Sequence, residues 1–478
     1  MFETNRVNSA MNRFHEADSI NLQSDSPHDS RIGDAPEKPL TSRAQGDNRT
    51  SMTSETARLA AADSPEALVK TLARDGRAAQ RVLARLSGAD KARAIAAASA
   101  ALREAEAEIL AANALDLAAG QANGLTSALL DRLKLDPARL AGIADAVDQV
   151  GRLEDPVGQV IDSSERPNGL RLSRVRVPIG LIGIIYESRP NVTADAAVLC
   201  VRAGNAALLR GGSEAVHSNR AIHAAMVRGL VSAGVPEAAV QLVPTQDRAV
   251  VGAMLTAAGL IDMIVPRGGK SLVARVQADA RVPVLAHLDG ICHTYIHSAA
   301  DPAMAKALAL NAKMRRTGIC GATETLLLDA QFPASQDVIA ALIEAGCELR
   351  GDARARALDP RVLPASANDW DTEYLDAILS VAVVDGIEAA LAHIERHSSH
   401  HTDAIVTGDD GAAERFLNEV DSAIVMVNAS TQFADGGEFG LGAEIGIATG
   451  RLHARGPVAL EGLTTYKWQV RGSGQARP

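Results

Sequence analysis

Cys320 combines a reactive residue type with neighbours that could activate it. It stands in the stretch NAKMRRTGICGATETLLL, between Gly318 and Gly321 and one turn after Arg315 and Arg316. Flanking glycines let a ligand approach closely, and nearby cations favour the thiolate, which is the nucleophilic form of cysteine. The same pattern also fits an inert buried cysteine that follows the basic end of a helix. This stretch alone leaves both interpretations open.

Two glycine-rich stretches each join an expected strand to an expected helix: LLRGGSEA (residues 208–215) and IVPRGGKSL (residues 264–272). Backbone N–H groups and the helix dipole at such a junction favour phosphate groups. A Walker A loop ending in the second stretch would need glycine at position 264, where this chain has isoleucine. A third stretch, GLGAEIG (residues 440–446), lacks the spacing of a dinucleotide fingerprint and a preceding strand. Either of the first two loops could simply turn the chain, but together they favour a dinucleotide ligand.

A cluster of histidines occurs in HIERHSSHHTDAI, residues 393–405. His393 and His397 stand one helical turn apart, a spacing that could bind a metal ion. No cysteine or carboxylate completes an obvious ligand set. A structural or substrate-binding role is therefore expected, and no metal site is predicted.

Apolar runs alternate with helical segments along most of the chain. Residues 64–149 are expected to be helical, and residues 159–178 to form a β-hairpin with Asn168-Gly169 at its tip. From residue 180 onward, short apolar strands alternate with helices of roughly 10–20 residues. This alternation predicts parallel sheets covered on both faces. The expected strands are residues 180–186, 206–210, 239–243, 261–265, 282–288, 292–297, 323–328, 379–384, 403–407, 422–428 and 457–472.

The composition is typical of a globular protein. The chain has 478 residues, 47% hydrophobic and 22% charged, which predicts a large core and roughly two to four domains. The net charge of −10 argues against a nucleic-acid-binding protein, and no apolar run reaches the roughly 20 residues of a membrane span. The 4 cysteines show no paired spacing, which favours a reducing compartment. The polar residues 1–60 are expected to be a disordered tail.

Six stretches together carry a resemblance to a known family. They are VPIGLIGIIYESRPNVTADAA, GNAALLRGGSEA, MRRTGICGATETLLL, ALAHIERHSSHHTDAI, VNASTQFADGGEFGLGAEIG and LHARGPVALEGLTTYKW. From about residue 64 to residue 472, the chain resembles the gamma-glutamyl phosphate reductases of the aldehyde dehydrogenase superfamily. The resemblance implies an α/β, aldehyde dehydrogenase-like fold. It has a Rossmann-type cofactor-binding domain (61–288), an α/β catalytic domain (289–450), and a small β oligomerisation flap, made by the hairpin at 159–177 and a C-terminal strand within 451–478.

The resemblance also implies a reaction. It is the NADPH-dependent reduction of L-glutamyl 5-phosphate to L-glutamate 5-semialdehyde with release of phosphate, the second step of proline synthesis from glutamate. Cys320 would displace phosphate to form a thioester, which then accepts hydride. The amide of Asn191 and the N–H of Cys320 itself would stabilise the oxyanion. A cytoplasmic homodimer or homotetramer is implied, with the upstream glutamate 5-kinase as a further partner.

Binding residues follow from the same resemblance. It assigns Arg210, Ser213 and Glu214 to the adenosine ribose, with Arg210 also at a 2′-phosphate; Gly268, Gly269, Lys270 and Ser271 to the pyrophosphate; Glu373 to the nicotinamide ribose; and Arg189, Arg316 and His401 to the doubly anionic substrate. Two positions depart from related patterns. Gln432 replaces an arginine that is common in the family, and His287 stands where hydrolytic aldehyde dehydrogenases place a glutamate base.

Two other functions fit the sequence less well. A thioester-forming dehydrogenase that uses coenzyme A is disfavoured by the histidine stretch and by the arginines before Cys320. A non-catalytic interaction protein that keeps only the fold is disfavoured because Cys320 and both glycine loops are retained.

Overall fold

The computed structural model describes residues 64–477, and its first part is helical. The helices are α2 (Pro65–Leu83), α3 (Gly88–Glu104), α4 (Glu106–Ala122), α5 (Ser127–Leu133) and α6 (Pro137–Arg152). Side-chain oxygens satisfy free backbone N–H groups at the starts of these helices except α4. Ser64, Thr126 and Asp136 are N-caps, and Ser87 forms a capping box with Asp90. None of the helices within residues 64–477 has the length and apolar character needed to cross a bilayer.

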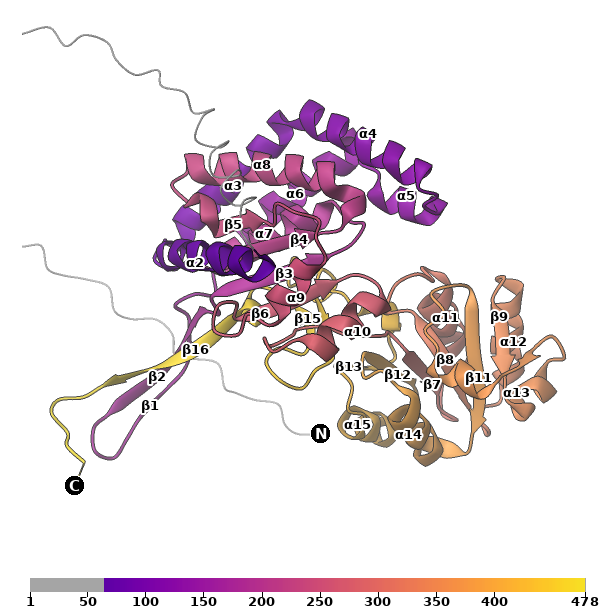
Figure 1. Cartoon of the computed structure of the whole chain (residues 1–478). Coiled ribbons are helices and arrows are strands. Elements are labelled where there is room, and N and C mark those ends of the chain that lie inside the picture. The colour runs from indigo at the N-terminus through magenta and orange to yellow at the C-terminus, as the bar shows by residue number, and fades with distance from the viewer. Residues whose placement is uncertain (1–63, 478) are drawn as a thin grey trace, which may run out of the picture. The chain divides into compact units, whose positions relative to one another are not determined.

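A parallel sheet of four strands follows this helical part (Figure 1). Its elements are β3 (Leu181–Tyr186), α7 (Asn191–Arg202), β4 (Ala206–Gly211), the 3-10 turn η1 (Ser213–Ala215), α8 (Val216–Ser232), η2 (Glu237–Ala239), β5 (Val240–Leu242), α9 (Ala249–Leu255), β6 (Met263–Arg267) and α10 (Lys270–Asp279). The strand order is β5-β4-β3-β6. One apolar core packs α3, α6, α7 and α8 against the sheet, and a second packs α2 and α9, so the central strands are buried throughout.

A second parallel sheet has seven strands in the order β10-β9-β11-β8-β7-β12-β13. Its elements are β7 (Cys292–Ile296), α11 (Pro302–Met314), β8 (Thr323–Asp329), α12 (Ser335–Glu344), β9 (Glu348–Gly351), α13 (Ala353–Leu358), β10 (Leu363–Pro364), η3 (Ala367–Asp371), β11 (Ile378–Val384), α14 (Gly386–His397), β12 (Thr402–Val406), α15 (Asp410–Glu419) and β13 (Ile424–Val427). One apolar cluster joins α11, α12 and α13 to this sheet, and another joins α14 and α15. Helices therefore cover the sheet on both faces, as the alternation of strands and helices predicts.

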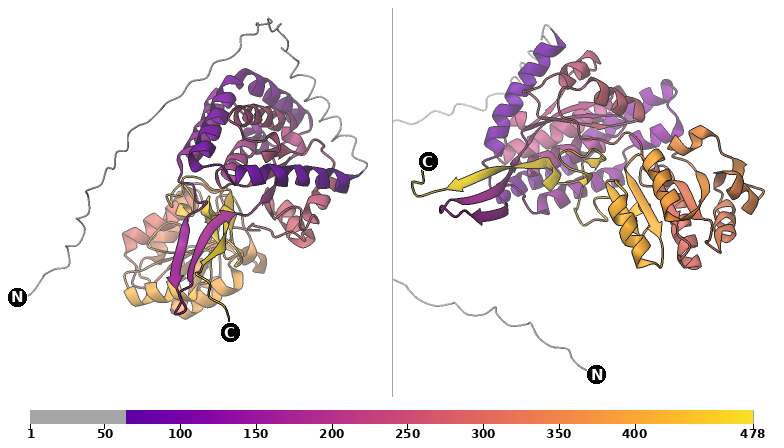
Figure 2. Two further views of the ribbon diagram at one scale, coloured as in Figure 1. Left: turned by 90° about the vertical axis from the view of Figure 1, so that its left-hand side faces the viewer. Right: turned by 90° about the horizontal axis from the view of Figure 1, so that it is seen from below.

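Three antiparallel strands form a small separate sheet, here called the flap: β1 (Val160–Glu165), β2 (Arg171–Pro178) and β16 (Thr464–Arg471). β1 and β2 are the predicted hairpin, and Gly169 in its turn has a φ of +82°, which favours glycine. Figure 2 shows the three strands extending together away from the two larger sheets. The remaining short elements are η4 (Thr431–Phe433), β14 (Gly446–Ala448), β15 (Gly456–Val458) and η5 (Glu461–Leu463).

Some segments differ from the prediction. Residues 282–288 are not a strand, because beyond one bridge between Ile264 and Val284 the segment is irregular; Pro283 within it has no N–H to donate. The strand expected at residues 457–472 is divided into β15 and β16 by η5. β9 and β10 were not predicted, because neither contains an apolar run. The predicted tail, residues 1–60, lies outside the described residues.

Candidate active site

A cavity of about 900 Å³ opens at the carboxyl ends of β3 and β6. Ligands of open parallel sheets usually bind at this edge. Loops from the second sheet complete the walls, including the loop between α11 and β8 and the segment between η3 and β11. Seven of the predicted site residues line it: Arg189, Gly268, Gly269, Lys270, Arg316, Cys320 and Glu373.

Cys320 lies in the loop between α11 and β8 and is partly exposed. Its backbone packs directly against Gly290, where an added Cβ atom would lie 2.2 Å from the carbonyl oxygen of Cys320. On the other side, an added Cβ at Gly321 would lie 3.0 Å from the carbonyl oxygen of Thr431. A side chain at position 290 would clash with this backbone, and one at position 321 would require the neighbouring backbone to shift by a few tenths of an ångström. Both glycines therefore help to fix the position of the sulfur.

The pKa of the Cys320 thiol is raised to about 11. Burial is the largest cause; Glu373 and Glu444 act in the same direction, and the guanidinium of Arg267 opposes them. The sequence predicts instead that the arginine pair at 315 and 316 favours the thiolate, yet both side chains are exposed. The principal cation acting on the thiol is Arg267, the last residue of β6.

Two neutral imidazoles lie beside Cys320. One ring nitrogen of His287, one of His401 and the sulfur of Cys320 lie within 4.8 Å of one another. Desolvation lowers the pKa of both rings, that of His401 to about 3. His287 Nδ1 donates to the carbonyl oxygen of Ile447 at 2.9 Å. His401 is fully buried and is not among the residues that line the cavity, so it offers no positive charge to an anionic substrate.

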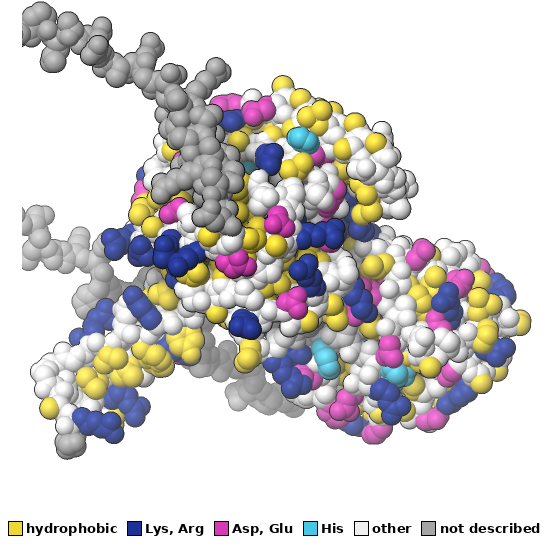
Figure 3. All heavy atoms as spheres, in the orientation of Figure 1, with side chains coloured by type: hydrophobic (Ala, Val, Ile, Leu, Met, Phe, Trp, Pro, Cys, Tyr) yellow, Lys and Arg dark blue, Asp and Glu magenta, His cyan; other side chains and the backbone are white. Residues whose placement is uncertain are grey.

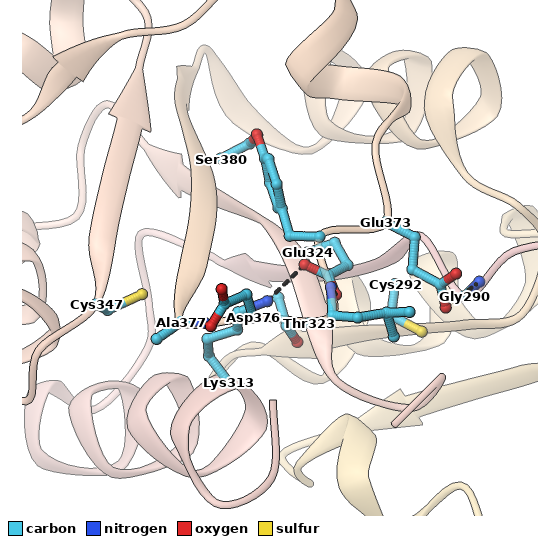
Figure 4. Close-up of polar contacts among 12 residues, drawn as sticks. Gly290, Cys292, Lys313, Thr323, Glu324, Cys347, Glu373, Asp376, Ala377 and Ser380 are labelled. Atoms are coloured by element: carbon cyan, nitrogen blue, oxygen red, sulfur yellow. Dashed lines mark hydrogen bonds and ion pairs between the residues drawn. The ribbon is translucent and has the colours of Figure 1, made fainter. Parts of the chain in front are cut away.

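Glu373 points toward the backbone next to Cys320, because it accepts the N–H of Gly290 at 2.9 Å. The loop that carries it rests on a buried ion pair. Lys313 Nζ lies 2.5 Å from Glu324 Oε2 with both side chains 0% exposed, and Glu324 Oε1 accepts the N–H of Leu375 at 3.3 Å. Figure 4 shows this pair, joined by a dashed line, and the carboxylate of Glu373 near Gly290. The second sheet therefore supports the position of Glu373.

The predicted pyrophosphate loop donates a backbone hydrogen bond to a carboxylate side chain of the protein itself. At the start of α10, the N–H of Gly269 donates to Glu187 Oε2 at 3.1 Å, as expected for a helix N-terminus that attracts anions. Lys270 Nζ lies 3.0 Å from Asp289 Oδ2. Ser271 is exposed in the first turn of α10 and does not line the cavity. The loop thus has the geometry of an anion site.

Arg210, Ser213 and Glu214 form a separate group at the carboxyl end of β4, outside the residues that line the cavity. Arg210 is 8% exposed, and its guanidinium donates to two backbone carbonyl oxygens at 2.8 and 3.1 Å. Its Nε is buried without a partner. Glu214 accepts the hydroxyl of Ser188 at 2.9 Å. This group lies at the same edge of the four-stranded sheet as the glycine loop, because β4 runs parallel to its neighbours.

Asn191, the predicted oxyanion residue, begins α7. Its Nδ2 donates to Asp195 Oδ2 at 2.8 Å, and it is not among the residues that line the cavity. Burial raises the pKa of Asp195 to about 6, while Asn191 and Arg267 oppose this rise. The structure therefore gives the amide of Asn191 a partner within its own helix, and its role toward the oxyanion stays a prediction.

Arginines from several elements line the cavity: Arg132 in α5, Arg189 after β3, Arg267 at the end of β6, and Arg315 and Arg316 after α11. Gln432 binds the end of α11, because its amide donates to the carbonyl oxygens of Ala312 at 2.9 Å and Arg316 at 3.1 Å. Its Oε1 lies 3.4 Å from Arg315 Nη1. Gln432 thus holds the chain segment that carries two arginines.

Comparison with known proteins agrees with this geometry. The sequence matches the aldehyde dehydrogenase family over residues 48–360. It is 76% identical over 417 residues to a gamma-glutamyl phosphate reductase of Novosphingobium aromaticivorans, which covers 87% of this chain and 98% of that protein. The chain belongs to the gamma-glutamyl phosphate reductases of the aldehyde dehydrogenase family. A gamma-glutamyl phosphate reductase of Rhodospirillum rubrum is 59% identical over 426 residues, which are 89% of this chain and 100% of that protein.

Solved structures support the same assignment. The crystal structure of gamma-glutamyl phosphate reductase from Thermotoga maritima has a TM-score of 0.84 and 42% identity, and the match covers 86% of this chain and 100% of that chain. An acetylating aldehyde dehydrogenase from Geobacillus thermoglucosidasius shares the fold, with a TM-score of 0.62 and 18% identity over 87% of this chain and 98% of that chain. The predicted aldehyde dehydrogenase-like α/β fold is therefore confirmed.

Sequence reasoning missed several residues at the site of this gamma-glutamyl phosphate reductase family member. They are Arg267, Asp289, Gly290 and Glu444. Arg267 and Gly290 had an available signal, because Arg267 lies within the glycine-rich stretch 264–272 and Gly290 lies three residues after His287. No signal in the sequence indicated Glu444, because it lies far from Cys320 along the chain and acts on that thiol only through the fold.

Proposed function

We propose that the chain reduces L-glutamyl 5-phosphate to L-glutamate 5-semialdehyde and releases phosphate, as the second step of proline synthesis from glutamate. The observation that carries this proposal is the position of Cys320, in one cavity with the glycine loop and with Arg189 and Arg316. A thiol nucleophile, a loop that binds anions and two arginines suit an acyl phosphate and a dinucleotide. The relatives described above bear the same activity in their names.

A nicotinamide cofactor, NADPH in preference to NADH, would fit the residues of the first sheet. The loop of Gly268, Gly269, Lys270 and Ser271 suits its pyrophosphate, because the N–H of Gly269 already binds a carboxylate. The unpartnered Nε of Arg210 supports a 2′-phosphate contact there, with Ser213 and Glu214 at the adenosine ribose and Glu373 at the nicotinamide ribose. When bound, this cofactor supplies the hydride.

The chemistry centres on Cys320. Its thiolate attacks the carbonyl carbon of the acyl phosphate, the bond from that carbon to the phosphate oxygen breaks, and phosphate leaves with the bonding electrons. Arg189 and Arg316 hold the anionic groups of the substrate. The oxyanion of each addition is stabilised by the N–H of Cys320 and by Asn191, whose amide gives one contact to Asp195. After reduction of the thioester, the thiohemiacetal collapses to the aldehyde and frees the thiolate.

The reaction is tested in its reverse direction. Purified full-length protein is supplied with L-glutamate 5-semialdehyde, phosphate and either NADP⁺ or NAD⁺, and formation of the reduced cofactor is followed by absorbance. Oxidation that depends on phosphate and is lost in Cys320→Ala is expected. Oxidation that needs coenzyme A instead of phosphate would assign the chain to the thioester-forming dehydrogenases. A wild-type rate in Cys320→Ala would remove Cys320 from the mechanism.

We also infer a homodimer or homotetramer assembled through the flap. β16 exposes large apolar side chains: Tyr466 is 48% exposed, Trp468 55% and Val470 56%. Figure 3 shows hydrophobic and basic side chains gathered on this projecting sheet. Exposed apolar patches of this kind mark protein–protein contacts. Glutamate 5-kinase, which makes the substrate, is the proposed further partner, in the cytoplasm.

A further inference from the structure

Three side chains from separate elements converge on one point beside the cavity. His287 comes from the segment before β7, Cys320 from the loop before β8, and His401 from the position before β12. One ligand atom of each lies within 4.8 Å of the other two, and no other group of three histidine, cysteine or carboxylate side chains within residues 64–477 meets this criterion.

In each of the two histidine rings, Nδ1 has a hydrogen-bond partner. The other nitrogen, Nε2, is free to bind a ligand. His287 Nδ1 donates to the carbonyl oxygen of Ile447 at 2.9 Å, which leaves a lone pair on Nε2. His401 Nδ1 is 2.9 Å from Thr402 Oγ1 and 3.6 Å from Cys292 Sγ. His401 Nε2 is buried and has no hydrogen-bond partner. A fully buried polar atom without a partner is rare and calls for an explanation.

Two neutral imidazoles and one thiolate form the donor set of a zinc site with three protein ligands and an open fourth position. In tetrahedral geometry the usual zinc–nitrogen and zinc–sulfur bond lengths place the donor atoms about 3.3–3.6 Å apart. The three atoms here must therefore approach by about 1.5 Å at most, which needs rotation of the partly exposed Cys320 side chain together with small shifts of the two rings. The nearby carboxylates of Glu373 and Glu444 favour a cation at this point, and Arg267 opposes it.

We propose that Zn²⁺ binds to His287, Cys320 and His401 and reversibly inhibits the enzyme. The sulfur–zinc bond forms as the Cys320 thiol releases its proton to solvent; no electrons are transferred, and a chelator restores the free thiol. Metal binding at this site does not depend on the reaction proposed above, whereas inhibition does, because the ion occupies the proposed nucleophile.

Binding is tested first on the intact, metal-free protein. Equilibrium dialysis with ZnCl₂ should show one Zn²⁺ per chain, and Co²⁺ should give visible bands of tetrahedral cobalt with a thiolate-to-cobalt charge-transfer band in the near ultraviolet. Bound Zn²⁺ should also protect Cys320 from iodoacetamide, as measured by peptide mass spectrometry. These measurements on the unaltered protein do not depend on whether a variant folds. Absence of the charge-transfer band or of protection would overturn the proposal.

Variants then assign the ligands. Loss of a residue that merely supports a metal ligand commonly costs 10–100-fold in affinity, so Cys320→Ser, His287→Asn and His401→Asn should each weaken zinc binding about tenfold or more. His453→Asn is the matched control, because His453 is exposed and lies outside the cavity; it should bind zinc as the wild type does. Equal affinity in all four variants would place the ion elsewhere.

Inhibition is measured after incubation with Zn²⁺ and again after a chelator is added. Loss of activity that the chelator reverses is the expected result. Metal-free protein that is inactive yet binds zinc through these three residues would reject the proposed function and keep the site. Active protein that Zn²⁺ binds without inhibiting would overturn the inhibitory role while leaving the proposed reaction intact.

Discussion

Gly290 and Cys320 are in direct backbone contact: a Cβ atom on Gly290 would lie 2.2 Å from the carbonyl oxygen of Cys320 and 2.7 Å from its Cα. Real Cβ atoms do not approach backbone so closely, so a side chain at position 290 must displace the loop that carries the thiol. The same glycine donates its N–H to Glu373. A single residue without a side chain thus joins the proposed nucleophile to the proposed nicotinamide–ribose contact.

Gly290→Ala should therefore lower kcat by about 100-fold, since a displacement of about 1 Å at a reacting group can cost this much. Gly318→Ala in the same loop is the matched control: its nearest atom, the carbonyl oxygen of Leu375, would lie 3.8 Å away, and most of the activity should remain. Steady-state rates and melting temperatures of both variants are compared. Similar rates in the two would show that the contact at Gly290 does not set the position of Cys320.

The Cys320 thiol should react with iodoacetamide faster as the pH rises past 9 toward 11, because its pKa is raised from 9.0 to about 11 and only the thiolate reacts. Glu444→Gln removes a charge that raises this pKa and should speed labelling at pH 8. Arg267→Gln removes the opposing charge and should slow it. Labelling rates at Cys320 are read by mass spectrometry across the pH range. A plateau below pH 9 in the wild type would contradict the raised pKa.

Arg210→Ala should raise KM for NADPH far more than KM for NADH. A charge-assisted contact to the 2′-phosphate is worth roughly 1.5–3 kcal/mol, or about 10- to 150-fold. Arg248 is an exposed neighbour whose charge also acts on Arg210, so Arg248→Ala serves as the comparison and should show the smaller discrimination. Equal effects of Arg210→Ala on both cofactors would locate the preference elsewhere.

His287→Ala should cost less than the roughly 10²–10⁴-fold that a general base contributes, although the ring lies beside Cys320. A hydrolytic dehydrogenase must activate water to cleave its thioester, whereas in the proposed reaction phosphate cleaves the thioester in the reverse direction. Wild-type oxidation of the semialdehyde should stay dependent on phosphate or arsenate. A thousand-fold loss with substrate affinity unchanged, or rapid oxidation without phosphate, would make His287 an essential base.

Lys313→Met should destabilise the protein by about 3–5 kcal/mol, because it leaves the fully buried carboxylate of Glu324 without its partner. Lys313→Met combined with Glu324→Gln should recover much of this loss. Arg415→Ala breaks exposed ion pairs with Glu388 and Glu419 and should barely change stability. Denaturant unfolding midpoints give the comparison. A Lys313→Met variant as stable as Arg415→Ala would show that the buried pair contributes nothing.

The strands that sequence predicted well are those with long apolar runs, such as β3 and β8, because burial on both faces requires such runs. The same rule failed for residues 282–288, where an apolar segment leaves the sheet after one bridge and leads into the active site. β9, with the sequence ELRG, had no signal because two of its four residues are charged. Pairing with β11 gives it its strand conformation.

For the site, residue types and spacing predicted Cys320 and the glycine loop at Gly269, and the structure brings these residues to one cavity; their roles stay predictions. Charge effects could not be predicted in the same way, because they depend on distances that only the fold sets. Arg267 and Glu444 act on Cys320 from other elements, whereas the arginines close in sequence are exposed. Asn191 and Asp195 lie one helical turn apart, so their hydrogen bond can be foreseen from the sequence. The raised pKa of Asp195 cannot, because it results from burial.

The flap has a consequence for the order of folding. The side chain of Arg176 in β2 donates a hydrogen bond to Thr464 in β16, 288 positions away. Both larger sheets lie between these two paired strands in the sequence. Contacts between such distant segments form late, and until then β2 presents an open edge able to pair with any matching strand. A β16 strand from a second copy satisfies that edge equally well, so refolding at high protein concentration favours exchange of this strand between chains.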